Sequence, residues 1–296
     1  MFRAQTFLIA LLPALVSAAG VSGASALEFT RHAVAFGPRP SGSEANHQLQ
    51  AYILTKLKTC KCQVIEDAFT PQTPKGPIAM KNIIAKFAGA QLQGKTGKAI
   101  VITGHYDTKL FPGRKFVGAN DGGSSAGLLL ELARVLAGQP RTDDVYLVWL
   151  DGEEAVRTEW AGQDNLYGSR HLAEQWSKDG TAAKIKGLIN VDMIGDKGLN
   201  IKQEQNSNSR LRQLVWRSAS DLGYKAYFVD ETITIEDDHM EFLKRGIPSL
   251  DLIDFDYGPD HRYWHTDEDT MDKLSAQSLE IVGTVVLDVI QRLERQ

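Results

Sequence analysis

The sequence has few cysteines, no surplus of basic residues and, beyond its N-terminal segment, no apolar stretch long enough to cross a membrane. Its 33 Lys and Arg residues against 37 Asp and Glu residues give a formal net charge of −4, which argues against a general nucleic-acid binder. Internal repeats and low-complexity tracts are absent as well, and the composition excludes collagenous, coiled-coil and disordered chains. With 43% hydrophobic and 24% charged residues, the chain has a globular composition and enough apolar material for a sizeable core.

The two cysteines, Cys60 and Cys62, are separated by a single residue. In an extended strand their side chains would point to the same side, but they would sit too far apart along the strand for good disulfide geometry. Two cysteines are also too few for a structural zinc site. We therefore expect both cysteines to be structural and unbridged.

The N-terminal segment has the features of a secretory signal peptide. Arg3 precedes an apolar run from Phe7 to Val16, and small residues follow as far as Ala24-Ser25-Ala26. A basic start, a short apolar centre and an A-x-A end are typical of a cleaved signal, and the run is too short for a spanning anchor. We expect cleavage after Ala26, so that residues 1–26 are the signal peptide and residues 27–296 form a secreted or periplasmic domain without a membrane anchor. An uncleaved anchor is the alternative.

Apolar strands and amphipathic helices alternate along the rest of the chain. Strands are expected twice within 63–90 and then over 98–104, 145–150, 185–194, 225–228 and 249–253, and helices over 27–57 (broken at 37–43), 124–137, 166–176, 209–222, 239–245 and 275–293. This alternation is typical of a sheet with helices on both faces, and strands that are apolar on both faces are typical of a parallel sheet. Since no linker interrupts the pattern, we predict a single three-layer α/β domain with a mostly parallel, twisted central sheet.

Ligands of such sheets bind beyond the carboxyl ends of the strands. Separate segments deliver histidines or acids to that edge, namely His105 with Asp107, Asp121, Asp151 with Glu153 and Glu154, Asp192, and His265 with Asp267. Imidazole and carboxylate groups suit zinc, and a catalytic zinc keeps one position open for water or substrate. Any one of these residues could be a helix cap or a structural side chain. Together they predict a site for one or two ions, with ligands drawn from His105, Asp121, Glu154, Asp192 and His265.

The adjacent acids Glu153 and Glu154 are expected to have different roles. Neighbouring residues at a strand end point in different directions, so that one can ligate the metal and the other can act as general acid and base. Such a base needs a pKa raised toward neutrality. Burial and nearby acids such as Asp192 or Asp237 would raise that pKa, and a metal ion would oppose the shift. The alternative is an acidic pair on the surface.

The motifs around these residues resemble those of a known group, the co-catalytic zinc aminopeptidases and their relatives, the glutaminyl-peptide cyclotransferases. The shared motifs are Gly104-His105-Tyr106-Asp107, Gly118-Ala119-Asn120-Asp121, Glu153-Glu154, Asn190-Val191-Asp192-Met193-Ile194-Gly195 and His265-Thr266. The resemblance covers nearly the whole chain after the signal segment. Several stretches look more like the cyclases, namely 69–74, 151–155 with Trp160, 164–172, 235–239, 242–248 and 264–266.

The cyclase resemblance implies a role for each matching residue. Asp121, Glu154 and His265 would hold one zinc ion, and Glu153 would shuttle the proton. Asp192 and Asp237 would form an acid relay with Glu153, and Trp160 and Trp264 would flank the substrate. The implied reaction converts an N-terminal glutamine of a peptide to pyroglutamate with release of ammonia. The expected partners are therefore peptide N-termini, and we expect a monomer.

Some positions depart from the cyclase pattern. The animal cyclases have a histidine where this chain has Asp251, and a cysteine pair where it has Gly104 and Ala126. The stretch 122–125 looks more like the corresponding stretch of the aminopeptidases. That resemblance implies peptide hydrolysis instead of cyclisation at the same edge of the sheet.

In the aminopeptidase branch, His105 and Asp192 would complete a second zinc site with Asp121 as the bridging ligand. Glu153 would then activate a water molecule that cleaves an N-terminal residue. A secreted zinc aminopeptidase is therefore the first alternative to the cyclase, and two ions rather than one are the alternative for the metal. A non-catalytic peptide-binding protein on the same fold is the second alternative, against which the intact ligand set and Glu153 speak.

Overall fold

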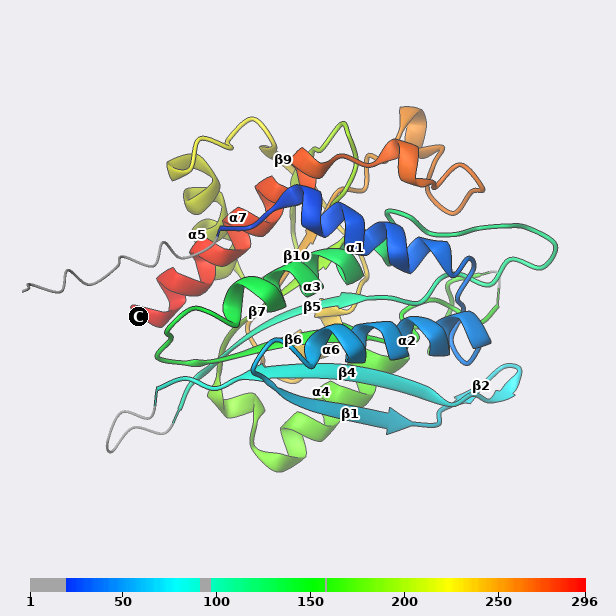
Figure 1. The fold of residues 1–296 in the computed structure, drawn as a ribbon, viewed down its shortest axis with the longest axis horizontal. Coiled ribbons are helices and arrows are strands. Elements are labelled where there is room, and N and C mark those ends of the chain that lie inside the picture. Colours follow the sequence, from blue (N-terminus) through cyan, green and yellow to red (C-terminus); the bar gives the residue numbers. More distant parts are fainter. Residues whose placement is uncertain (1–19, 91–96, 158) are drawn as a thin grey trace, which may run out of the picture.

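The computed structural model describes residues 20–90, 97–157 and 159–296, which form a three-layer α/β unit around a 6-stranded sheet (Figure 1). The sheet order is β1 (Gln63–Phe69), β4 (Met80–Phe87), β6 (Asp144–Leu150), β5 (Ala99–His105), β7 (Ile185–Asp192) and β10 (Ser249–Ile253). Neighbours from β6 to β10 run parallel, and β4 is antiparallel to both β1 and β6. The predicted fold class, a mostly parallel sheet, is confirmed.

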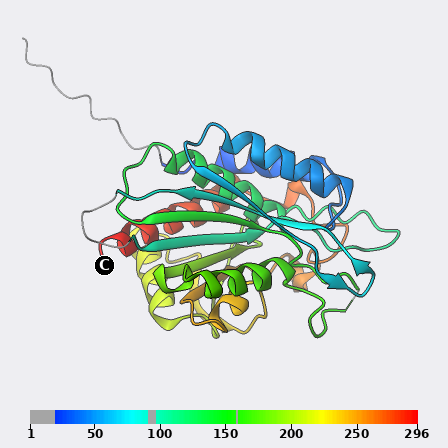
Figure 2. The same cartoon turned by 90° about the horizontal axis from the view of Figure 1, so that it is seen from below.

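Helices cover both faces of this sheet, as Figure 2 shows with the sheet seen from its side. One face carries α1 (Gly23–Ala35), α2 (Glu44–Leu57), α3 (Gly123–Leu136) and α7 (Ala276–Glu294), with α5 (Ser209–Asp221) packed beside α7. The other face carries α4 (Tyr167–Asp179) and α6 (His239–Leu243). Short 3-10 turns lie at η1 (Ala182–Lys184), η2 (Pro259–His261) and η3 (Met271–Lys273).

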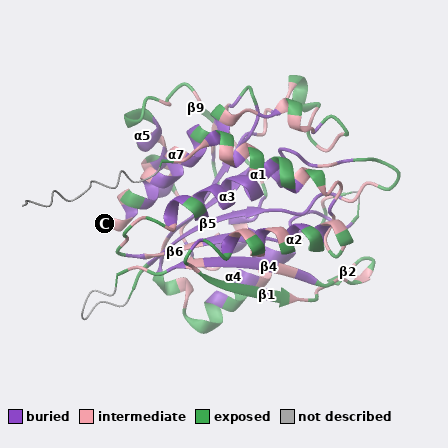
Figure 3. Ribbon diagram, viewed as in Figure 1, coloured by how far each residue is buried: buried purple, intermediate pink, exposed green. Residues whose placement is uncertain are grey.

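Successive residues of β5 supply the two halves of the core. Ile100 and Ile102 pack with the α3 and α7 side, whereas Val101 between them packs with Leu172 and Trp176 of α4. This follows from the strand geometry, which turns alternate side chains to opposite faces. Since every residue of β5 is buried (Figure 3), the strand lies in the interior of the sheet and its carboxyl end is enclosed by the protein.

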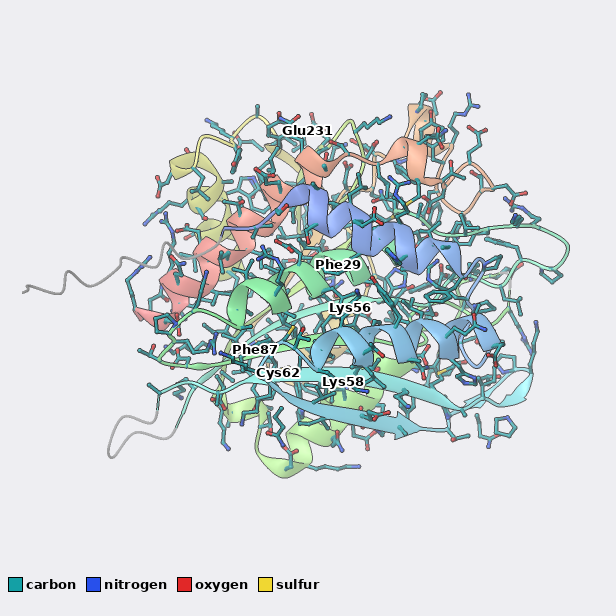
Figure 4. The ribbon with its side chains drawn as sticks, in the orientation of Figure 1. Phe29, Lys56, Lys58, Cys62, Phe87 and Glu231 are labelled. Carbon is teal, nitrogen blue, oxygen red and sulfur yellow. The ribbon has the colours of Figure 1, made fainter. Side chains whose placement is uncertain are left out.

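The capping and packing of the N-terminal helices are local. The Ser43 side chain accepts a hydrogen bond from the Asn46 backbone N–H and caps α2. Lys56 of α2 lies over the ring of Phe29 in α1, with 5.8 Å from Nζ to the ring centre (Figure 4). Cys60 and Cys62 are both free, but they lie in and just after the turn that follows α2 and not in a strand.

Two small sheets were not predicted correctly. A parallel pair joins β8 (Ile201–Glu204) to β9 (Phe228–Ile233), and a hairpin joins β2 (Gln72–Thr73) to β3 (Gly76–Pro77). The strand expected over 225–228 thus begins at Phe228, and β8 was missed altogether. The reason is that β8 has a single apolar residue, Ile201, and its other buried side chain is a glutamate.

The first residues that the structure describes belong to the folded body. Ser22 caps α1, Val21 packs against the core, and Ala26 is fully buried. Cleavage after Ala26 would therefore remove the cap and the first turn of α1. Residues 1–19, which hold most of the expected signal peptide, lie outside the described residues, so that cleavage stays a prediction. Among the helices that the structure describes, none has the length and apolar character needed to cross a bilayer.

Candidate active site

Most of the predicted acids and both predicted histidines meet at the carboxyl edge of the sheet. His105 ends β5 and Asp192 ends β7, while Glu153 and Glu154 follow β6. The loop after β5 carries Asp121 to the start of α3, and the loop after β10 carries His265. Both loops lie on the same side of the molecule, at the right of Figure 1.

Asp121, Glu154 and His265 form one group of possible metal ligands. His265 Nε2 lies 3.3 Å from Asp121 Oδ2 and 3.1 Å from Glu154 Oε1. One ligand atom of each residue lies within 4.8 Å of the others. Among the described residues, Asp121 Oδ2 and Glu154 Oε2 are buried without a hydrogen-bond donor. The unpaired Oδ2 of Asp121, with Glu154 Oε1 and an imidazole nitrogen beside it, fits a zinc ion with an open position.

A second group shares Asp121. His105 Nε2 lies 3.2 Å from Asp121 Oδ1 and 3.1 Å from Asp192 Oδ1, and one ligand atom of each of these three residues lies within 4.8 Å of the others. Asp121 therefore turns one oxygen to His265 and the other to His105. The arrangement has the form of a bridging carboxylate between two ligand groups.

The electrostatics of both groups favour positive charge. Burial lowers the pKa of His265, but Glu154 and Asp121 outweigh it and raise that pKa to about 10. Burial likewise lowers the pKa of His105, and the carboxylates of Asp192 and Glu153 raise it well above its ordinary value. Burial raises the pKa of Asp121, while the adjacent imidazoles of His105 and His265 outweigh it and hold that pKa below its usual range. The acids thus create the negative potential that a cation site needs.

Glu153 is buried and has the environment of a general base. Burial raises its pKa well above the ordinary value, and the charges of Glu154 and Asp237 add to the shift, while His105 opposes it. Burial also raises the pKa of Asp192 to about 7, again against the influence of His105. The structure thus gives Glu153 the raised pKa that the predicted proton transfer requires.

A cavity of about 320 Å³ opens beside these groups. The ring of Trp264 stacks on that of His265, with 4.1 Å between centres and 18° between planes. Trp160 lies in the same wall, and its buried Nε1 has no acceptor among the described residues. The other lining residues are Lys109, Asp121, Glu153, Glu154, Asp192, Met193, Thr234, Ile235, Glu236, Asp237, Ile253 and Phe255. The two tryptophans that were expected to flank the substrate therefore border one cavity.

Asp237 and Asp251 are linked through Asn190. The Asn190 side-chain amide donates to Asp237 Oδ2 at 3.0 Å and to Asp251 Oδ1 at 3.1 Å. Thr103 donates to the Asn190 carbonyl oxygen at 2.8 Å and fixes its orientation. Asp251 is fully buried and does not line the cavity. Asp251, the residue at which the chain departs from the animal cyclases, is thus connected to Asp237 through the Asn190 amide group.

Sequence reasoning missed the residues that hold these groups in place. Arg39 is fully buried and donates to the backbone carbonyls of Tyr106 (2.7 Å), Gly118 (2.8 Å) and Asp121 (3.4 Å). It therefore braces the loop between β5 and α3. The sequence around Arg39 indicates only a loop, and no periodic pattern marks a buried arginine.

Two acids hold the backbone of the ligands. Asp107 accepts from the backbone N–H groups of Glu153 at 3.2 Å and Glu154 at 3.3 Å. Asp269 accepts from the backbone N–H of Asp121 at 3.1 Å and from the Tyr257 hydroxyl at 2.6 Å. Asp267, which the sequence placed at the sheet edge, instead lies on the surface and pairs with Arg114.

The sequence and the fold both match known proteins. Residues 82–290 match the model of peptidase family M28. The chain is 30% identical over 258 residues to a glutaminyl-peptide cyclotransferase of Drosophila melanogaster, covering 78% of this chain and 70% of that protein.

Two solved structures have the same fold. A glutaminyl cyclase from an Acidobacteriales bacterium is 40% identical, with a TM-score of 0.88 and coverage of 99% of both chains. A Zn-dependent exopeptidase from Parabacteroides distasonis is 26% identical, with a TM-score of 0.80 over 93% of this chain and 99% of that one. The family and this exopeptidase both point to a metal ion in the buried His and carboxylate site. The chain belongs to peptidase family M28 and, within it, to the group related to the glutaminyl-peptide cyclotransferases.

Proposed function

We propose that this protein is a zinc-dependent glutaminyl-peptide cyclotransferase, which converts an N-terminal glutamine of a peptide to pyroglutamate and releases ammonia. The observation that carries the proposal is the placement of Glu153, with its raised pKa, beside the ligands Asp121, Glu154 and His265 in one cavity. The likeness to glutaminyl cyclases in sequence and fold supports it.

Asp121, Glu154 and His265 are the proposed ligands of a single ion, because all of them line the cavity. A zinc ion held there would supply Lewis-acid polarisation of the substrate γ-carbonyl group. The group formed by His105, Asp121 and Asp192 is the place where a second ion would bind, but His105 does not line the cavity.

Glu153 is the proposed proton carrier. Its carboxylate accepts a proton from the α-amine as the amine nitrogen attacks the γ-carbonyl carbon. The same carboxyl group then donates a proton to the side-chain nitrogen, the bond from that nitrogen to the γ-carbon breaks, and ammonia leaves. Because burial raises the pKa of Glu153 and the charges of Glu154 and Asp237 add to the shift, the carboxyl group can hold the proton between the two steps. Asp192 and Asp237 form the acid relay in this proposal.

The size of the cavity is consistent with a substrate that is the terminal residue of a peptide. Its volume of about 320 Å³ suits one side chain and its backbone rather than a folded surface. Trp264 is 36% exposed at the rim, so that the remainder of a peptide can leave toward solvent past this ring. Trp160 and Trp264 are therefore the proposed walls for the glutamine side chain.

The aminopeptidase reaction is the second candidate, and a specific observation favours it. The group of His105, Asp121 and Asp192 keeps ligand geometry for a second ion. Mass spectrometry of two peptides, one beginning with glutamine and one with leucine, separates the candidates. Loss of ammonia from the first peptide with the second intact is expected. Release of free leucine would refute the cyclase proposal, and no reaction of either peptide would leave the peptide-binding alternative.

Export is also part of the proposal, and a monomeric state stays a prediction. Because Val21, Ser22 and Ala26 belong to the folded body, we place signal cleavage before Val21 rather than after Ala26. N-terminal sequencing of the exported protein tests this position. A chain that begins at Leu27 would contradict it.

A further inference from the structure

Lys109 is buried in the wall of the cavity without a hydrogen-bond acceptor among the described residues. Its residue exposure is 1%, and the single ion pair it makes within that part of the chain is to Glu154 Oε2, at 3.7 Å from Nζ. Burial of an ammonium group is costly unless the charge is compensated. The position of Lys109 therefore calls for a role at Glu154.

The two carboxylate oxygens of Glu154 face different partners. Oε1 lies 3.1 Å from His265 Nε2, on the side of the proposed metal ligands. Oε2 faces Lys109 and accepts no hydrogen bond from the described residues. The backbone N–H of Glu154 donates to Asp107 at 3.3 Å, which fixes the start of the side chain. The Glu154 carboxylate therefore lies between the imidazole of His265 and the ammonium group of Lys109.

The backbone that carries Lys109 is anchored as well. The neighbouring Thr108 accepts from the Arg39 backbone N–H through Oγ1 at 2.9 Å and donates its own N–H to the Arg39 carbonyl at 3.3 Å. Arg39 is fully buried. The backbone beside Lys109 is therefore fixed by hydrogen bonds, and the Lys109 side chain is buried along its length to Glu154.

We propose that Lys109 is a positioning residue that withholds Oε2 of Glu154 from the metal. Glu154 then offers only Oε1, and one coordination position stays open, as a catalytic zinc requires. The positive charge of Lys109 also limits the negative charge that the metal experiences, which preserves its attraction for a substrate carbonyl oxygen. This inference rests on the metal-binding part of the proposed function and not on the identity of the substrate.

Substitution of Lys109→Met in the full chain tests this role. The neutral side chain frees Oε2 and removes a positive charge from the vicinity of a dication. We expect zinc to bind at least roughly tenfold more tightly, measured by competition with a chromophoric chelator. The visible bands of the Co(II) form should weaken, because a second carboxylate oxygen raises the coordination number. With a reacting peptide, kcat should fall while KM stays nearly constant.

Two further variants separate charge from packing. Lys109→Arg keeps the charge and should stay close to the wild type in zinc affinity. Lys109→Gln removes the charge with a polar side chain and should reproduce the effect of Lys109→Met, which protects the test if the methionine variant does not fold. Lys86→Met is the matched control, because Lys86 pairs with Asp144 at 2.8 Å at the opposite end of the sheet. It should leave both zinc affinity and the Co(II) spectrum unchanged.

Zinc affinity equal to or weaker than that of the wild type in both neutral variants, with an unchanged Co(II) spectrum, would overturn the proposal. That result would leave the cyclase proposal intact. A wild-type protein that binds no zinc would overturn both. Failure of the wild type to cyclise glutamine, with tighter zinc binding in Lys109→Met, would refute the proposed reaction alone.

Discussion

The two ligand groups at the sheet edge share Asp121 but differ in what surrounds their histidines. The His265 side chain is 19% exposed, and among the acids that the structure describes its Nε2 pairs only with Asp121 and Glu154. The His105 side chain is 1% exposed and lies within 3.8 Å of four carboxylates, those of Asp107, Asp121, Glu153 and Asp192. All three residues of the first group line the cavity, whereas the histidine of the second group does not, although Asp121 and Asp192 do. We refer to Asp121, Glu154 and His265 as the open group, and to His105, Asp121 and Asp192 as the closed group.

This difference teaches that ligand geometry alone does not define a working metal site. Both groups bring the right atoms together. They differ in their access to the cavity, because His265 lines it and His105 does not. A protonated His105 can instead balance the surrounding acids, in keeping with its strongly raised pKa.

The largest expected effect comes from breaking the first group. His265→Gln should abolish zinc binding and with it all cyclase activity, because the open group loses its only nitrogen ligand. His105→Gln should keep one zinc ion per chain. Elemental analysis of both purified variants checks the pair. Loss of the ion from His105→Gln, with retention in His265→Gln, would invert the comparison.

Glu153→Gln should lower kcat by about 10²–10⁴-fold, since the amide cannot accept the amine proton. Its zinc content should match that of the wild type, because Glu153 is not in either ligand group. Steady-state kinetics with a glutamine-initiated peptide measure the effect. A variant with full activity would remove Glu153 from the mechanism and favour the binding alternative.

Asp269→Asn sharpens the comparison at the shared ligand. Asp269 accepts from the Asp121 backbone N–H at 3.1 Å, and an asparagine retains only one acceptor oxygen. We expect zinc affinity to fall about 10–100-fold, as for other outer partners of metal ligands. Asp272→Asn is the control on the same segment, because Asp272 pairs with Lys273 at the surface. Equal affinities in the two variants would contradict the role of Asp269.

Trp264→Ala should have the smallest effect, a rise in KM of about 5- to 30-fold, because loss of the ring removes about 1–2 kcal/mol of contact with the substrate. The kcat should change less than KM, since Trp264 holds no proton. Trp216→Phe is the control, because Trp216 lies in α5 and donates to the Val229 carbonyl away from the cavity. A lower kcat with constant KM in Trp264→Ala would assign the ring to orientation of His265, on which it stacks.

Much of the central sheet could be predicted from the sequence. The strands β5, β6, β7 and β10 are buried on both faces and therefore appear in the sequence as apolar runs. The exception is β8, which buries Glu204 through hydrogen bonds from Asn206 and Ser207 and so lacks the apolar alternation of a strand. A charged residue that is buried by local hydrogen bonds does not contribute to a hydrophobic period in the sequence. Periodicity therefore cannot predict such a strand.

The candidate site, like the fold, could be predicted only in part from the sequence. Strand ends and motifs identified the acids and histidines that the structure brings together, although their roles stay predictions. Arg39, Lys109 and Asp269 were not identified, because their contacts come from segments far apart in the sequence. A buried lysine beside a carboxylate looks like any surface lysine until the fold is known.

Titration of the metal-free protein with zinc, with pyroglutamate formation measured at each step, tests the central claim most directly. If the open group of Asp121, Glu154 and His265 is the working site, activity should rise linearly and reach its maximum at one equivalent of zinc per chain. Activity that appears only as a second equivalent binds would show that the closed group of His105, Asp121 and Asp192 takes part, and would contradict the account.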